Sequence, residues 1–115
     1  MVREITPNPQ AGTRARDYAR EVTRGLYPRL ESDLCSVVTE LVQVAFMNDP
    51  ERPIFLSLRR HHTTVSGTVE TYSEELAGGE QARLTRRILD ALCAEWEFVS
   101  DRGRTHVWFW LAPRG

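Results

Sequence analysis

Few side chains in this sequence have the types and spacing that catalysis or metal binding requires. Cys35 and Cys93 stand alone, with no CxxC motif and no histidine at metal-ligand spacing. A zinc site or a disulfide framework needs clustered ligands or paired cysteines. We therefore predict two small, buried thiols without a chemical role.

Two other groups of residues can be read in two ways. His61 and His62 could suggest a metal pair, but adjacent residues of a hairpin point apart and no third ligand is evident, which favours a solvated turn. Arg83, Arg86 and Arg87 could hold a phosphate, and the exposed side of an amphipathic helix explains them equally well.

Length and composition indicate one ordinary globular domain spanning residues 1–115. Hydrophobic residues make up 41% and charged residues 27%, and the net charge is −1. The near-neutral charge argues against nucleic-acid binding, which depends on a strong positive field. No run of about 18 apolar residues is present and the first residues lack an apolar stretch, so we expect neither export nor membrane spanning, and a cytoplasmic location.

Hydrophobic periodicity predicts three helices and four strands. The first helix carries Ala15, Tyr18, Ala19, Val22 and Leu26 at spacings of three and four, and Gly25 and Pro28 are expected to end it. Ser32 is a plausible N-cap for the second helix. The expected helices cover residues 13–26, 32–47 and 81–95, and the expected strands 54–60, 64–72, 97–100 and 105–111.

The short connections between consecutive strands favour hairpins, with turns at 61–64 and 101–103. Residues 73–80 are polar with two glycines and predict a loop. The fold class that follows is α+β, a two-layer α/β sandwich with a mostly antiparallel sheet and three helices packed on one face.

This order of elements, together with several local motifs, resembles the GHKL ATPase superfamily, in particular the short anti-sigma-factor and serine-kinase-like proteins of bacteria. The resemblance spans almost the whole chain. Its motifs are Thr39-Glu40-Leu41-Val42 with Ala45, then Leu92 to Trp96, then Gly103-Arg104-Thr105 with Val107-Trp108-Phe109.

The resemblance implies an ATP site whose ligands this sequence has lost. The superfamily's magnesium-binding Asn falls at Val44, and its adenine-reading Asp falls at Thr71, within one residue, where the stretch TYSEE (residues 71–75) contains no glycine. A magnesium ion needs a hard oxygen ligand and an adenine amino group needs an acceptor. Gly78 and Gly79 lie upstream of the expected lid glycines, which align near residues 83–86.

We therefore expect a regulatory, protein-binding member of this type with weak or absent ATP binding and no cofactor. The resemblance implies a sigma factor or an anti-sigma antagonist as the partner, a fold-level inference. The alternative is a divergent protein serine/threonine kinase that binds ATP and Mg²⁺ through Glu40, which matches the family's acidic residue, and Asn48, one helical turn beyond Val44.

Strand alternation predicts an aromatic contact surface on the sheet face away from the helices. If Val107, Phe109 and Leu111 face the core, the residues between them face outward. So much exposed aromatic surface is unusual for a monomer and favours a homodimer seam or a partner dock, unless Val2 and Ile5 of the N-terminal segment fold over it. The expected contact residues are Phe55, Tyr72, His106, Trp108 and Trp110.

Overall fold

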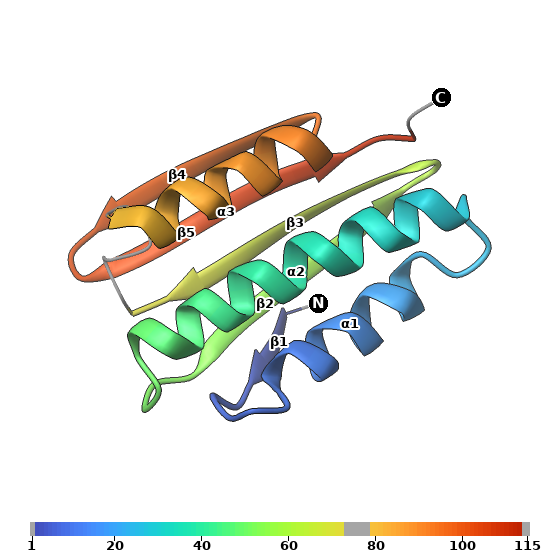
Figure 1. The fold of residues 1–115 in the computed structure, drawn as a ribbon. Helices are drawn as coiled ribbons and strands as arrows, with labels where there is room; N and C mark the ends of the chain where they lie inside the picture. The colour runs from blue at the N-terminus through green and yellow to red at the C-terminus, as the bar shows by residue number, and fades with distance from the viewer. Residues whose placement is uncertain (1, 73–78, 114–115) are drawn as a thin grey trace.

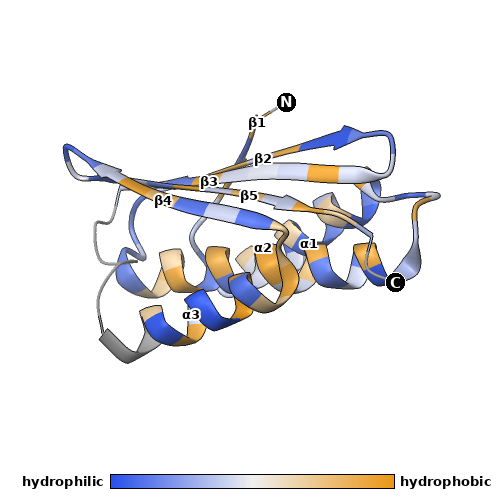
Figure 2. Cartoon of the chain, turned by 90° about the horizontal axis from the view of Figure 1, so that it is seen from above, coloured by the Kyte–Doolittle hydropathy of each residue, from blue (hydrophilic) through white to orange (hydrophobic). Residues whose placement is uncertain are grey.

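The computed structural model describes residues 2–72 and 79–113, which form one antiparallel sheet covered on one face by helices. The order of strands across the sheet is β1-β2-β3-β5-β4. Figures 1 and 2 show α1, α2 and α3 side by side beneath the same face of the sheet. The elements are β1 (Val2–Ile5), α1 (Ala11–Val22), α2 (Pro28–Asn48), β2 (Ile54–His61), β3 (Thr64–Thr71), α3 (Gly79–Leu92), β4 (Glu95–Asp101) and β5 (Arg104–Leu111). The predicted two-layer α+β fold is confirmed.

The core lies between the sheet and the central helix α2. Alternate residues of β2, β3 and β5 point into it, as the sequence pattern predicts, because a strand turns successive side chains to opposite faces. The side chains with no measurable exposure include Leu34, Val37, Val38, Leu41, Val42, Leu56, Val65, Val69, Leu89, Val107, Phe109 and Leu111. None of the helices in the described residues is both long and apolar enough to cross a membrane.

The N-terminal segment forms an additional strand, which the sequence analysis did not predict. Val2 pairs with Ser57 and Ile5 with Ile54 along the outer side of β2. Ile5 is buried in the core while Val2 is 62% exposed. The segment therefore adds a strand to the edge of the sheet and does not cover the aromatic side chains. Four residues with one buried side chain carry too short a pattern to be read as a strand.

Three predicted helix boundaries were wrong by three residues or more. Helix α1 ends at Val22, four residues before the predicted end at 26. Helix α2 begins at Pro28, because a proline suits the first helical position, and Tyr27 provides the extended residue before it. The carbonyl of Tyr27 accepts hydrogen bonds from the amides of Leu30 and Glu31. Ser32, predicted as the N-cap, therefore lies inside the helix. Helix α3 ends at Leu92, three residues before the predicted end at 95, and Cys93 and Ala94 lead into β4.

The buried face of α3 also differs from the predicted one. The helical spacing of Leu84, Ile88 and Ala91 in the sequence predicts that these residues share the buried face. In the structure Leu84 is 52% exposed and Ala91 is exposed. Ala82, Thr85 and Leu89 are buried instead. This face contains a threonine, which a pattern of apolar residues does not include. The helix is therefore rotated about its axis relative to the orientation that the apolar pattern predicts.

The edge of β2 beyond β1 is covered by a side chain of α1. The Tyr18 hydroxyl accepts a hydrogen bond of 3.3 Å from the amide of Leu58 and donates one of 3.5 Å to the carbonyl of the same residue. β1 pairs with β2 only as far as Ser57, so this hydroxyl satisfies the backbone groups immediately beyond the end of β1.

Close packing within the sheet depends on Gly67. Its neighbours across the strands are Leu58 and Phe109, and a Cβ added to Gly67 would lie 2.5 Å from Cζ of Phe109 and 2.7 Å from Cδ2 of Leu58. A glycine at this position therefore makes the space into which the Phe109 ring packs.

Candidate functional site

The structure describes two regions where the sequence predicted function: the α2–α3 region, where the family resemblance would place a nucleotide site, and the open face of the sheet. In the first region, Glu40 of α2 and Thr85 of α3 are brought together. Oγ1 of Thr85 donates a hydrogen bond of 2.9 Å to Oε2 of Glu40, and the Thr85 side chain has no exposed surface. Glu40, the acid that the family resemblance singles out, is therefore engaged by the neighbouring helix.

Two of the positions at which the family resemblance would place nucleotide ligands are closed. Val44 is 2% exposed and belongs to the hydrophobic core, and Thr71, at the end of β3, is 3% exposed. Asn48 is the exposed last residue of α2. Gly79 is the first residue of α3, and Gly78 lies outside the described residues. Apolar packing at Val44 leaves no polar group there that could coordinate a cation.

A depression of about 690 Å³ runs over the outer side of the helix layer, and Glu40 is part of its lining, whereas Val44 and Thr71 are not. Its two arginines already have partners. Arg16 donates to Thr39 Oγ1 over 3.4 Å, and Arg20 lies 3.9 Å from the Glu31 carboxylate. The carboxylates of Asp17 and Glu31 offset the charge of Arg20, whereas the Thr39 hydroxyl accepts a hydrogen bond from Arg16 without neutralising it.

The other candidate chemical groups do not converge. His61 Nε2 lies 3.1 Å from Ser66 Oγ, while His62 occupies the hairpin turn with φ of 51°. Arg86 lies over the ring of Phe98 at 5.6 Å, and Arg83 and Arg87 are exposed. The described residues contain no group of three side chains suited to hold a metal ion.

Both cysteines are poor nucleophiles because burial disfavours their thiolates. Burial raises the pKa of the Cys35 thiol, an effect that the nearby Arg20 opposes. Burial, reinforced by the carboxylates of Asp33 and Asp90, raises the pKa of Cys93 to about 12. A thiol reacts through its thiolate, so neither side chain is activated.

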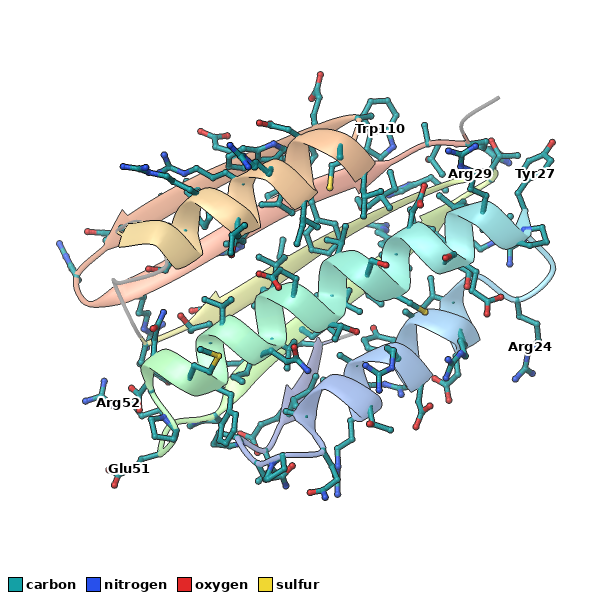
Figure 3. The ribbon with its side chains drawn as sticks, viewed as in Figure 1. Arg24, Tyr27, Arg29, Glu51, Arg52 and Trp110 are labelled. Carbon is teal, nitrogen blue, oxygen red and sulfur yellow. The ribbon has the colours of Figure 1, made fainter. Side chains whose placement is uncertain are left out.

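The open face of the sheet carries the predicted aromatic residues, and we call Phe55, Tyr72, His106, Trp108 and Trp110 the aromatic face. Val107, Phe109 and Leu111 are fully buried, and His106 and Trp108 between them are exposed, Trp108 by 37%. The outward direction inferred from alternation is therefore confirmed. Trp110, which is labelled near the C-terminal end of β5 in Figure 3, is half-buried.

One end of the aromatic face is held by ring contacts. Phe55 and Tyr72 meet edge to face with their centroids 6.4 Å apart. The guanidinium groups of Arg52 and Arg104 lie 5.4 Å and 5.2 Å from the Tyr72 ring centroid. Arg104 also pairs with Glu70 at 3.3 Å. These contacts fix the rings in place before any partner binds, which lowers the entropy lost on binding.

Around Trp108 the open face is hollowed on two sides, and the two hollows differ in charge. One hollow of about 500 Å³ is lined by Arg59, His61, Thr64, Ser66, Trp108 and Trp110. The other, of about 410 Å³, is lined by Asp90, Cys93, Ala94, Glu95, Trp96, Glu97 and Trp108. The first contains basic side chains and no carboxylate, and the second contains three carboxylates.

Sequence reasoning missed two features of these regions. The Thr85–Glu40 hydrogen bond was not foreseen, although Thr85 stands three residues after Ala82 and four before Leu89, a spacing typical of one helix face. The two outward carboxylates at the start of β4, Glu95 and Glu97, were also missed as a pair, because the strand was predicted to begin two residues later than Glu95. The sequence matches no protein-family model, and no curated protein is significantly similar to it.

Proposed function

We propose that this chain is a regulatory protein-binding module of the anti-sigma-factor type, which binds ATP weakly or not at all and contacts its partner through the aromatic face. The observation that carries the proposal is the gathering of aromatic side chains on the sheet face opposite the helices, where Trp108 is 37% exposed and Phe55 and Trp110 are half-buried. Trp and Tyr are the side chains that most often dominate the energy of protein interfaces.

The buried position of Val44 and the hydrogen bond between α2 and α3 support the non-catalytic part of the proposal. Val44 is buried in the core where the family resemblance requires a magnesium ligand, and Thr85 is hydrogen-bonded to Glu40. Losing an oriented contact to a ligand costs about 1–3 kcal/mol. Losing two such contacts and the lid glycines lowers affinity by several powers of ten.

The family assignment rests on the order of elements and on the motifs of α2, α3 and β5. With β1 added, the structure retains the succession of two helices, a hairpin, a helix and a second hairpin on which the resemblance depends. The partner class that follows from the resemblance is a sigma factor or an anti-sigma antagonist.

Calorimetric titration with ATP and Mg²⁺ tests the nucleotide part. We expect no measurable heat of binding. Micromolar binding, accompanied by transfer of phosphate to a protein substrate, would establish the divergent serine/threonine kinase instead, with Glu40 and Asn48 as the residues to substitute first.

Affinity capture from cells that express the chain tests the partner part. The bait is compared with a Trp108→Ser, Trp110→Ser double variant, and Leu84→Ser on α3 is a matched control because Leu84 is 52% exposed in the helix layer. We expect a sigma factor or an anti-sigma antagonist to be captured by the wild type and the control and lost with the double variant. Equal capture by all three would show that the aromatic face is not the contact.

A further inference from the structure

The outward side chains of four strands form rows that cross the sheet, and each row changes in character from one side to the other. One row consists of Arg59 on β2, Ser66 on β3, Trp110 on β5 and Glu95 on β4. It therefore runs from a cation through a small hydroxyl and a large indole to a carboxylate. Both Arg59 and Glu95 are exposed.

The next row repeats the pattern of size. Ser57 and Thr68 on β2 and β3 are small, Trp108 on β5 is large, and Glu97 on β4 is acidic. Across these two rows, β2 and β3 carry small side chains and Arg59. The side chains of β5 are two large indoles, and those of β4 are carboxylates.

A surface of this kind is complementary to itself. A two-fold axis parallel to the strands and midway between β3 and β5 would place β5 of one copy over β3 of the other, and β4 over β2. Within the first row, Trp110 then lies over the second copy's Ser66, and Glu95 over the second copy's Arg59. Within the second row, Trp108 lies over the second copy's Thr68. Large side chains meet small ones and opposite charges meet.

The third row agrees with the same operation. It consists of Phe55, Glu70, His106 and Val99 from β2 to β4. The rotation brings Val99, which is 52% exposed, over the second copy's Phe55, and His106 over the second copy's Glu70. Two sheets that pack face to face lie about 10 Å apart and within about 30° of alignment, so the rows correspond best near the axis.

We propose that the aromatic face packs against the same face of a second copy of this chain about this two-fold axis. A symmetric dimer requires one patch that complements itself, and both halves of the complement are present on this face. This dimer rests on the proposed function, because both take the aromatic face as a protein contact. The second copy occupies that face when no regulatory partner is bound. Self-association and partner capture then exclude each other.

Charge reversal at one contact tests the geometry. In an Arg59→Glu homodimer both copies bring like charges to Glu95, and in a Glu95→Arg homodimer both bring like charges to Arg59. We expect the wild type to sediment with twice the 13.2 kDa mass of the chain, and each single variant to dimerise at least about tenfold more weakly. Arg87→Glu on α3 is the matched control and should dimerise like the wild type.

Mixing the two single variants gives the decisive measurement. Each mixed pair restores an opposite-charge contact at both positions, so heterodimers should form where neither variant pairs with itself, and the Arg59→Glu, Glu95→Arg double variant should form homodimers again. Circular dichroism shows that each variant is folded.

A monomeric wild type overturns the proposal, as does a dimer that neither reversal weakens or that mixing does not rescue. These outcomes leave the proposed function to be judged by ATP titration and partner capture. Conversely, tight Mg-ATP binding would refute the proposed function without changing the dimer measurement.

Discussion

Val44→Asn puts an amide where the family resemblance would place a magnesium ligand, and we expect it to weaken the fold without creating a nucleotide site. Val44 is 2% exposed, and burying a valine side chain contributes about 1.5–3 kcal/mol to the free energy of unfolding. A buried amide without partners adds a cost of about 1–3 kcal/mol. Allowing for relaxation around the new side chain, we expect a loss of about 3–4 kcal/mol.

The assay combines chemical denaturation with calorimetric titration of ATP and Mg²⁺. A domain with a free energy of unfolding of about 5–15 kcal/mol remains folded after such a loss, so both measurements are possible. Met47→Asn places the same amide on the same helix at a residue that is 66% exposed, and it should cost no more than about 0.5 kcal/mol.

The reasoning would be refuted if Val44→Asn bound Mg-ATP with micromolar affinity, or if it destabilised the chain no more than Met47→Asn does. Either result would mean that the space beside α2 can admit a polar ligand. The hydrogen bond between Thr85 and Glu40 would then have to open at little cost to accommodate it.

Three further changes follow from the packing and from one pKa. Gly67→Ala should lower the free energy of unfolding by about 1–3 kcal/mol, measured by denaturation in urea, because the new methyl group would lie 2.5 Å from Cζ of Phe109. Thr85→Val removes the hydrogen-bond donor to Glu40 and should cost about 1 kcal/mol, with a double-mutant cycle through Glu40→Ala giving the coupling. The Cys93 pKa is raised from 9.0 to about 12, so the folded chain retains a proton that the unfolded chain loses. Its stabilising contribution is therefore complete below about pH 9 and is lost as the pH rises toward about 12, a slope that urea titrations of Cys93→Ala should lack.

The fold could be predicted from the sequence wherever a long periodic pattern specifies a buried face. The apolar arc of α2 and the alternation in β2 and β5 are both of this kind, and their buried residues agree with the prediction. Strand β1 was missed because its only buried side chain is Ile5. The buried face of α3 was predicted wrongly because it includes Thr85. Pairing between strands and polar residues in the core are decided by tertiary contacts, which a local pattern does not contain.

The candidate site was predictable only in part. The outward direction of Trp108 and Trp110 follows from their position between buried neighbours on β5. The position of Arg59 and Glu95 in the same row could not be predicted in this way. These residues are 36 positions apart in the chain and are related only through the pairing of four strands. Single-chain periodicity gives the face on which a side chain lies, and the register between strands gives its neighbours.

The hydroxyl of Tyr18 makes the two margins of the sheet unequal. By satisfying the amide and carbonyl of Leu58 beyond the end of β1, it covers the part of β2 that β1 leaves unpaired at this margin. β4, the strand at the other margin, carries Glu95, Glu97 and Asp101 on its exposed side. A strand added beside Leu58 would find no free backbone partner there, and a second copy added along β4 would bring like-charged carboxylates together, which opposes polymerisation.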